Sequence, residues 1–401
     1  CAEVCPHDLS MAPVCMEGRV GLVDRNKMPP SAHDFALEDM RSSNSEKSAL
    51  ALHEPGRDQS AFVFFAGCQL GAAYPDHIVH SYAYLRKILK GGVGLMLRCC
   101  GAPAQWAGRV DLFKGSIMDI SRDWERLGRP VIITACPTCH QILKGHLPYA
   151  RFTTLWHILE STEAVDRKRP CATLAIHDPC TTRHEPAMQQ SVRRILTRSG
   201  YAIEELELSG DRTECCGFGG LMSASNPPLA RDVAKTRASR SETDYVTYCA
   251  MCRNALAASG KRVVYILDLL FGGETDPASR RVPGLSERHE NRYRLKQRLL
   301  KELWGTREGK MDDYEKITLH ISPEVQKVME ERRILIEDAQ KVIDHAEKSG
   351  VKLFNPDLGH WLASFKPAHV TYWVEYSPEE AGFSVHNAYC HRMEVVGNAG
   401  S

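Results

Sequence analysis

The tripeptide Cys99-Cys100-Gly101 recurs in the second half of the chain as Cys215-Cys216-Gly217. Each copy lies between a single upstream cysteine and a downstream Cys-x-x-Cys pair. The gaps between the cysteine groups are 30 and 35 residues in the first set and 34 and 32 in the second. The two sets are Cys68, Cys99, Cys100, Cys136 and Cys139, and Cys180, Cys215, Cys216, Cys249 and Cys252. The pattern indicates that one domain has been duplicated.

Five thiols in each copy favour an iron–sulfur cluster as the bound group. A tetrahedral zinc site uses four ligands, and the side chains of two adjacent cysteines do not easily converge on one small ion. Zinc stays open as an alternative for the Cys-x-x-Cys pairs, and so do buried free thiols. Structural disulfides would need an oxidising compartment, and the composition is not that of a small disulfide-rich domain. We therefore expect a protein of the reducing cytoplasm.

Apolar strands precede the cysteines in both copies and alternate with helices. In the first copy the expected strands are 61–65, 93–97 and 130–134, with helices near 77–89 and 111–127. In the second copy the expected strands are 173–176, 203–208 and 244–247. Each copy ends in a strand followed by a helix, at 152–160 and at 262–270. This alternation predicts α/β domains with small parallel sheets over 60–165 and 166–275, with the cysteines at the carboxyl ends of the strands.

The motif, complete in both copies, resembles that of the CCG, or cysteine-rich, domain family of heterodisulfide reductase B and D subunits and related electron-transfer proteins. The resemblance covers about residues 60 to 275. It implies that the ten cysteines bind two noncubane [4Fe-4S] clusters at which a disulfide or thiol substrate exchanges electrons. It also implies an oxygen-sensitive oxidoreductase that works with other redox subunits, and two cysteine-bearing rims that face each other across a cleft.

The chain opens with Cys1-Ala-Glu-Val-Cys5-Pro6, which matches the closing part of a ferredoxin run, C-x2-C-x2-C-x3-C-P. We therefore expect residues 1–59 to be the end of a ferredoxin-like 4Fe-4S module and a helical linker, with a helix over 32–40 and a linker over 41–60. Cys1 and Cys5 would be ligands of ferredoxin-type clusters whose other ligands lie upstream. The glycine-rich stretches at 91–94 and 216–220 do not form a dinucleotide-binding fingerprint. FAD or NAD(P)H is expected only through an upstream or partner flavoprotein.

Histidines near the cysteines are weaker candidates for chemistry. His140, His177 and His184 could supply protons while a substrate disulfide is reduced. The more ordinary alternative is that a histidine in such a loop caps backbone groups or a cluster sulfur. The remaining thiols, Cys15, Cys171 and Cys390, are expected to be buried or free.

The C-terminal third divides into a basic helical segment over 276–310 and a small α+β unit over 311–401. Leucines at 295, 299 and 303 form one helical stripe, which favours a packing helix with a solvated basic face over a docking surface for an acidic electron donor. The α+β unit is expected to hold a long helix near 323–349 and a hairpin that pairs 370–376 with 383–389. Its possible metal ligands fit no known spacing: His345, His360, His369, His386, Cys390 and His391.

Composition and charge exclude several classes of function. Lys and Arg number 51 against 50 Asp and Glu, which gives no electrostatic case for binding nucleic acid. No apolar run is long enough to cross a bilayer, so a membrane link would need a partner subunit. The sequence predicts an iron–sulfur oxidoreductase that passes electrons from ferredoxin-type clusters to two further clusters that reduce a disulfide. The alternatives are an electron-relay subunit of a flavin- or quinone-linked complex, and a structural zinc protein.

Overall fold

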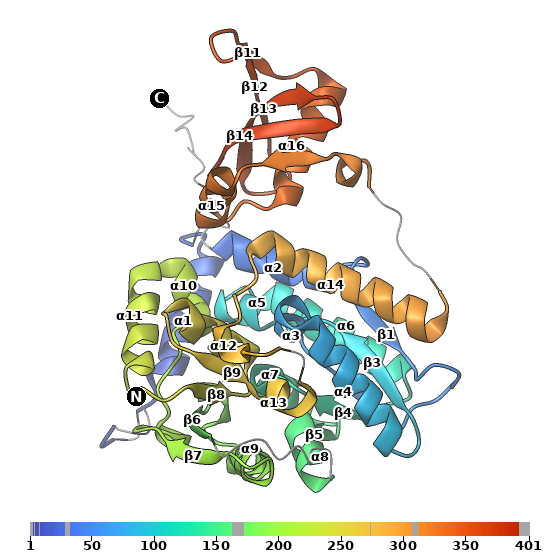
Figure 1. Cartoon of the computed structure of the whole chain (residues 1–401), viewed down its shortest axis with the longest axis vertical. Helices are drawn as coiled ribbons and strands as arrows, with labels where there is room; N and C mark the ends of the chain where they lie inside the picture. Colours follow the sequence, from blue (N-terminus) through green and yellow to red (C-terminus); the bar gives the residue numbers. More distant parts are fainter. Residues whose placement is uncertain are drawn as a thin grey trace.

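The computed structural model describes residues 3, 5–7, 9–28, 33–162, 172–272, 274–306 and 312–392. Cys1 and Cys171 lie outside these residues. The described part of the chain contains three sheets, two of them in the lower body of Figure 1 and one in the upper unit. This mixed α/β architecture with small parallel sheets confirms the predicted fold class.

The first domain is built on a sheet with the order β1-β3-β2-β4-β5. Residues alternate between its two faces: Phe64 and Leu95 pack against one set of helices, and Val63 and Met96 against another. Helices cover both faces, so the central strands are apolar throughout. The strands are Leu50–Leu52, Val93–Leu97, Phe62–Phe65, Val131–Thr134 and Phe152–Thr154, and the covering helices include α4 (Pro75–Ile88), α6 (Val110–Arg126) and α8 (Leu155–Ser161).

One expectation for this domain was wrong. The segment 41–60 is not simply a linker, because α2 (Asp34–Asn44) extends into it and β1 pairs antiparallel with β3 at the edge of the sheet. Leu50 and Ala51 are buried in this position. The short apolar stretch thus extends the sheet by one strand. The helix expected over 32–40 is confirmed as α2, whereas α1 (Met11–Asp24) buries no residue.

The second domain repeats the first around a sheet with the order β7-β6-β8-β9, in which all pairs are parallel. This order corresponds to β3-β2-β4-β5 of the first domain and confirms the duplication. The strands are Ala202–Glu205, Thr173–His177, Tyr245–Thr247 and Val263–Tyr265, and the helices are α9 (Pro186–Arg198), α11 (Pro227–Ala238), α12 (Ala250–Ala258) and α13 (Ile266–Phe271).

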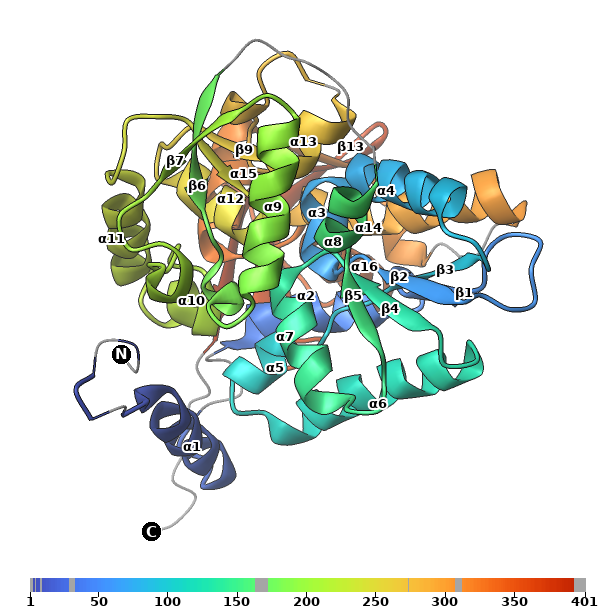
Figure 2. The ribbon, with the colours of Figure 1, turned by 90° about the horizontal axis from the view of Figure 1, so that it is seen from below.

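The two domains share an apolar, aromatic interface. Figure 2 shows α8 of the first domain beside α9 of the second, and the contacts between these helices agree. The rings of Tyr74 and Tyr265 stack with their centroids 5.3 Å apart. Beside them, His77 Nε2 lies 2.7 Å from the carboxylate of Asp268. One continuous core therefore holds the two sheets in a fixed relation.

The basic segment contains α14 (Leu285–Leu299), which packs against α3 (Cys68–Ala73) of the first domain. Leu295 and Leu299 are buried there, as the leucine stripe predicts. The prediction that the basic face of this helix is solvated was wrong in part, because Arg292 and Lys296 are only 4% and 3% exposed. The helix lies between two surfaces, so these cations turn inward, Arg292 to Asp39 and Lys296 to the carbonyl of Glu46.

The C-terminal unit has its own core, in which α16 covers one face of a five-stranded sheet. The predicted hairpin is confirmed as β13 and β14. The prediction of one long helix near 323–349 was wrong. The first helix, α15, ends before Arg333, which has a left-handed φ of 58°, and a second helix, α16, starts at Ile336. The elements are β10 (Leu319–Ile321), α15 (Pro323–Arg332), α16 (Ile336–Ser349), β11 (Leu353–Asn355), β12 (His360–Phe365), β13 (Thr371–Glu379) and β14 (Gly382–His391).

This unit rests on the lower body above α2 and α14, as Figure 1 shows. The carboxylate of Glu330 on α15 accepts hydrogen bonds from the backbone N–H of Leu285 at 2.8 and 3.0 Å. Arg333 donates to the carbonyl of Ser223 at 2.8 Å. Throughout the described residues, every helix is too short or too polar to cross a bilayer.

Candidate metal centres

In each domain the cysteines lie at one edge of the sheet. Cys68 begins α3 after the central strand β2, and Cys180 begins the 3-10 turn Cys180–Thr182 after β6. The Cys-x-x-Cys pairs occupy the N-cap and the third residue of α7 (Pro137–His146) and of α12. Parallel strands end at the same edge, so all five thiols of a set converge. The positive end of the helix dipole favours thiolates at the two N-termini.

The five sulfurs of the first set form a chain of contacts: Cys68 with Cys99, Cys99 with Cys100, Cys100 with Cys139, and Cys139 with Cys136. Hydrogen bonds from Cys139 and Cys99 lower the pKa of the Cys100 thiol despite its burial. The contact with Cys99, together with burial, raises the pKa of Cys68 well above its ordinary value, and the contacts with Cys100 and Cys136, together with burial, do the same for Cys139. Thiolates crowded in this way repel one another unless cations hold them together.

The second set repeats this chain: Cys180 with Cys215, Cys215 with Cys216, Cys216 with Cys252, and Cys252 with Cys249. Hydrogen bonds from Cys180 and Cys216 lower the pKa of Cys215, and the backbone N–H of Gly217 donates to its sulfur at 3.3 Å. The structure thus brings together the ten cysteines of the two CCG sets, five in each domain, but not Cys5, and Cys1 lies outside the described residues.

Glycines after the paired cysteines let the chain turn closely around each set. Gly101 and Gly217 both have a φ of +86°. A Cβ at Gly217 would stand 2.4 Å from the carbonyl oxygen of Ala230, and one at Gly101 would stand 3.0 Å from Phe113 and Ser116. Only glycine fits both the backbone angle and the space.

The two sets meet around a buried tyrosine. Cys136 of the first set packs against the apolar cluster that contains Cys216, Cys249 and Cys252. Burial, and after it the nearby thiols of Cys249 and Cys136, raise the pKa of Tyr265 well above its ordinary value. Tyr265 therefore lies within electrostatic reach of both sets.

A cavity of about 350 Å³ opens beside the first set, and all five of its cysteines line the cavity. Phe218, Leu221 and Met251 of the second domain form apolar walls, but no cysteine of the second set lines this cavity. The expected cleft shared by two cysteine rims is therefore asymmetric: the second domain supplies walls, and the first supplies the sulfurs. Arg288, Glu330 and Arg333 line the cavity from the C-terminal third.

Charged residues beside Cys68 were not predicted from the sequence as parts of the site. Arg292 and Arg288 from α14 act electrostatically on the Cys68 thiol, and Arg292 pairs with the carboxylate of Asp39. Arg288 donates to the side-chain oxygen of Gln69. The sequence did contain a hint of their position. Arg288 and Arg292 are four residues apart and continue the stripe of Leu295 and Leu299, so all four side chains lie on the packed side of the helix.

The three candidate histidines lie in different surroundings, and none lines the cavity. His140 is buried, with Nδ1 3.0 Å from the hydroxyl of Thr134, and burial lowers its pKa. His177 is completely buried, and desolvation together with the charge of Arg237 lowers its pKa to about 3. His184 is exposed, with Nε2 3.4 Å from the carboxylate of Glu3.

That last contact places Glu3 beside the turn that follows Cys180. Cys5 is half-buried, and the backbone N–H groups of His7 and Leu9 lower its pKa. Its predicted partner Cys1 lies outside the described residues.

The C-terminal histidines do not assemble a centre. His360 and His386 stack with ring centroids 3.5 Å apart, and His345 stacks on Phe365. Among the described residues, the group with three possible ligand atoms within 4.8 Å of one another is His177, Cys216 and Cys252.

A duplicated α/β body that gathers five thiols at the carboxyl edge of each sheet defines a cysteine-rich protein with two thiol clusters. The model of the CCG cysteine-rich domain family matches residues 62–144 and 174–257. The chain therefore contains two CCG domains.

Curated relatives of the chain are redox proteins at low identity. The D subunit of dihydromethanophenazine:CoB–CoM heterodisulfide reductase from Methanosarcina barkeri is 22% identical over 300 residues, which cover 64% of this chain and 70% of the relative. The EtfAB:quinone oxidoreductase of Syntrophomonas wolfei is 23% identical over 252 residues, 55% of this chain and 35% of the relative. The glycolate oxidase iron-sulfur subunit of Escherichia coli is 30% identical over 95 residues, 23% of either chain. The chain is thus homologous to the D subunit of heterodisulfide reductase and similar to iron–sulfur redox subunits more broadly.

Proposed function

We propose that this chain is an iron–sulfur oxidoreductase subunit whose ten gathered cysteines hold two clusters, of the noncubane [4Fe-4S] type that the CCG resemblance implies. The observation that carries the proposal is the convergence of five thiols on one sheet edge in each domain, with one set open to a cavity. Bound clusters supply reversible one-electron storage at both edges.

The first donor set fits an iron–sulfur cluster better than a single zinc ion. Tetrahedral zinc with thiolate ligands would hold every pair of sulfurs about 3.8 Å apart, given Zn–S distances of ~2.3 Å. Within the described residues, no three sulfurs of the first set form such a compact group, since they are strung out from Cys68 to Cys136. An extended row of thiols suits several iron atoms.

The cavity supports disulfide reduction at the first set. Its apolar walls would receive a disulfide beside Cys68 and Cys136, the two half-buried cysteines of that set. Arg288 and Arg333 line the cavity together with the carboxylates of Asp39 and Glu330, so its charged rim carries both signs. In the reaction the S–S bond breaks, two electrons enter from a partner redox subunit, and two protons convert the products to thiols.

The arrangement also suggests an order of electron transfer. Glu3 of the N-terminal segment, which we propose to be ferredoxin-like, contacts His184, four residues after Cys180 of the second set. The second set in turn meets the first around Cys136 and Tyr265. Electrons from a ferredoxin-type cluster would thus pass through the second domain to the first, where the cavity lies.

A second candidate is an electron-relay subunit without disulfide chemistry. The similarity to an EtfAB:quinone oxidoreductase and to a glycolate oxidase iron-sulfur subunit favours it. In that case the first set would face a flavin- or quinone-linked partner instead of a disulfide.

The test uses anaerobically purified full chain, assayed for iron, labile sulfide and zinc, and for disulfide reduction with a reduced viologen. We expect about two clusters' worth of iron and sulfide in the ten-cysteine body. Cys68→Ala and Cys180→Ala should each abolish disulfide turnover, while viologen still reduces the remaining cluster. Near-normal turnover in either variant would favour the relay function, and stoichiometric zinc without sulfide would refute both.

A further inference from the structure

Because the domain is duplicated, the residue that ends the central strand of the first domain can be compared with its counterpart in the second domain. Phe65 closes β2 three residues before Cys68, and His177 closes β6 three residues before Cys180. Both side chains are completely buried. The second domain thus places a polar imidazole where the first has a hydrocarbon ring, and burial of that imidazole is favourable only if its nitrogens find partners.

Arg237 determines which nitrogen of this imidazole carries the hydrogen. Its Nε donates to Nδ1 of His177 at 3.0 Å, and its Nη1 donates to the carbonyl of Glu207 at 2.8 Å, so the guanidinium is held in place. A guanidinium has donors only and keeps its protons, so Nδ1 must be the acceptor. A neutral imidazole whose Nδ1 lone pair is engaged carries its hydrogen on Nε2.

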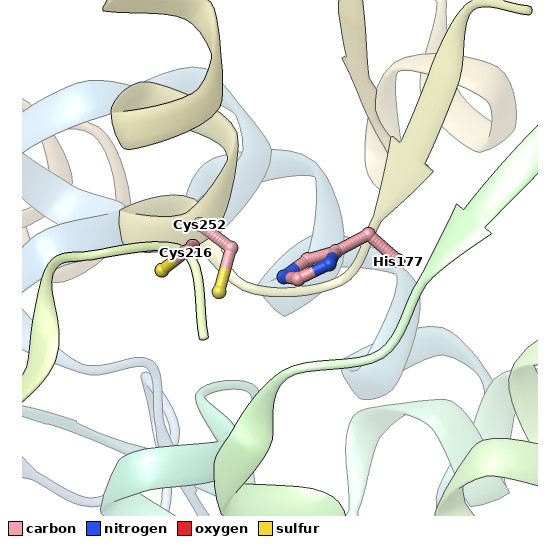
Figure 3. A group of neighbouring side chains, drawn as sticks. All are labelled: His177, Cys216 and Cys252. Carbon is pink, nitrogen blue, oxygen red and sulfur yellow. The ribbon is translucent and has the colours of Figure 1, made fainter. Parts of the chain in front are cut away.

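The other nitrogen, Nε2, is turned to the second cysteine set. His177 offers a ring nitrogen within 4.8 Å of the sulfurs of Cys216 and Cys252, and Figure 3 shows the ring edge pointing at these sulfurs. Although it is buried, Nε2 has no hydrogen-bond partner among the described residues. The N–H of Nε2, which has no partner, therefore faces the sulfurs of Cys216 and Cys252.

We propose that His177 is a fixed N–H donor to a sulfur of the second set, with its tautomer set by Arg237, and that it is a positioning residue, not a metal ligand. The inference deepens the proposed function and rests on it for the cluster that the second set holds. An N–H···S hydrogen bond stabilises the more negative, reduced form of a cluster, so His177 should raise the reduction potential of the second cluster. The first cluster, with Phe65 at the matching place, lacks this donor.

The central variant is His177→Phe, which gives the second domain the residue of the first. In the anaerobically purified full chain we expect unchanged iron, a lower potential for the second cluster in EPR-monitored titration, and an unchanged potential for the first. Proton ENDOR in H₂O and D₂O should lose one exchangeable coupling from the second cluster. His177→Gln, which keeps an N–H donor, should recover part of the shift, and Phe65→Leu is the matched control that should leave the second cluster unaltered.

Two further measurements keep the inference separate from the proposed function. On the metal-free full chain, ¹⁵N-histidine NMR reports the tautomer directly, with the His177 signal assigned through its loss in His177→Phe; hydrogen on Nδ1 would overturn the inference even if both clusters form. On the loaded protein, a strong direct nitrogen coupling would show that His177 is a ligand and would equally overturn it. If the chain binds no iron or sulfide, the proposed function is refuted. If that same chain shows hydrogen on Nε2, the hydrogen position that we assign to His177 is still supported.

Discussion

Asp39 holds the charges beside the first cysteine set in balance. Arg292 donates to its carboxylate, Nε2 of His289 lies 3.0 Å from the same oxygen, and Gln69 donates to the other oxygen at 3.3 Å. Burial works against ionisation of Asp39, but the charge of Arg292, the contact with His289 and the charge of Arg288 outweigh it and hold its pKa well below the ordinary value. The carboxylate is thus charged at every physiological pH, and it anchors the guanidinium that faces Cys68.

At the residue scale we predict that Asp39→Asn lowers the free energy of unfolding by about 3 kcal/mol, because it leaves the buried Arg292 cation without its counter-charge. Urea unfolding of the anaerobic protein measures this. Since the folded pKa is depressed, the difference should be complete above the unfolded value of about 3.9 and should shrink as the pH falls below it. Asp119→Asn, which breaks an exposed pair with Arg122, should cost less than about 1 kcal/mol. Equal losses in the two variants would contradict the prediction.

At the scale of elements, α11 approaches the second cysteine pair so closely that Gly217 is constrained. We predict that Gly217→Ala destabilises the protein by at least about 2 kcal/mol, from the left-handed backbone and the clash with the carbonyl of Ala230. Gly219→Ala is the control, since its Cβ would meet open space, and it should cost about 1 kcal/mol or less. Thermal unfolding and iron content measure both; a stable, fully loaded Gly217→Ala would show that α11 moves aside.

The elements around most of the cysteines could be predicted because short apolar runs end two or three residues before Cys68, Cys99, Cys136, Cys180 and Cys249, and helices separate them. β1 was missed because three residues at a sheet edge carry almost no periodicity of their own. The break between α15 and α16 was missed because Arg333 adopts a left-handed backbone without being glycine or asparagine. Asp39 and Arg288 joined the site through contacts between distant segments, which sequence spacing alone does not reveal.

At the scale of the whole molecule, the two sets belong to separate sheets that meet through one shared core. We predict that Cys216→Ser and Cys100→Ser each remove one cluster and leave the other assembled, because each set is carried by its own domain. Iron analysis should show a loss of roughly half in each variant, and EPR should show complementary losses of signal. The simultaneous disappearance of both signals from either variant would mean that the two clusters assemble as one unit.

The position of α14 has a consequence for how the protein is made. Leu295 and Leu299 complete the apolar face that Phe64 and Ile78 begin, yet they leave the ribosome only after the entire second domain. Until then the nascent first domain presents an open apolar groove next to five reduced thiols. The apolar core of the first domain is therefore completed only after the second domain has been synthesised, by a helix that lies more than two hundred residues further along the chain.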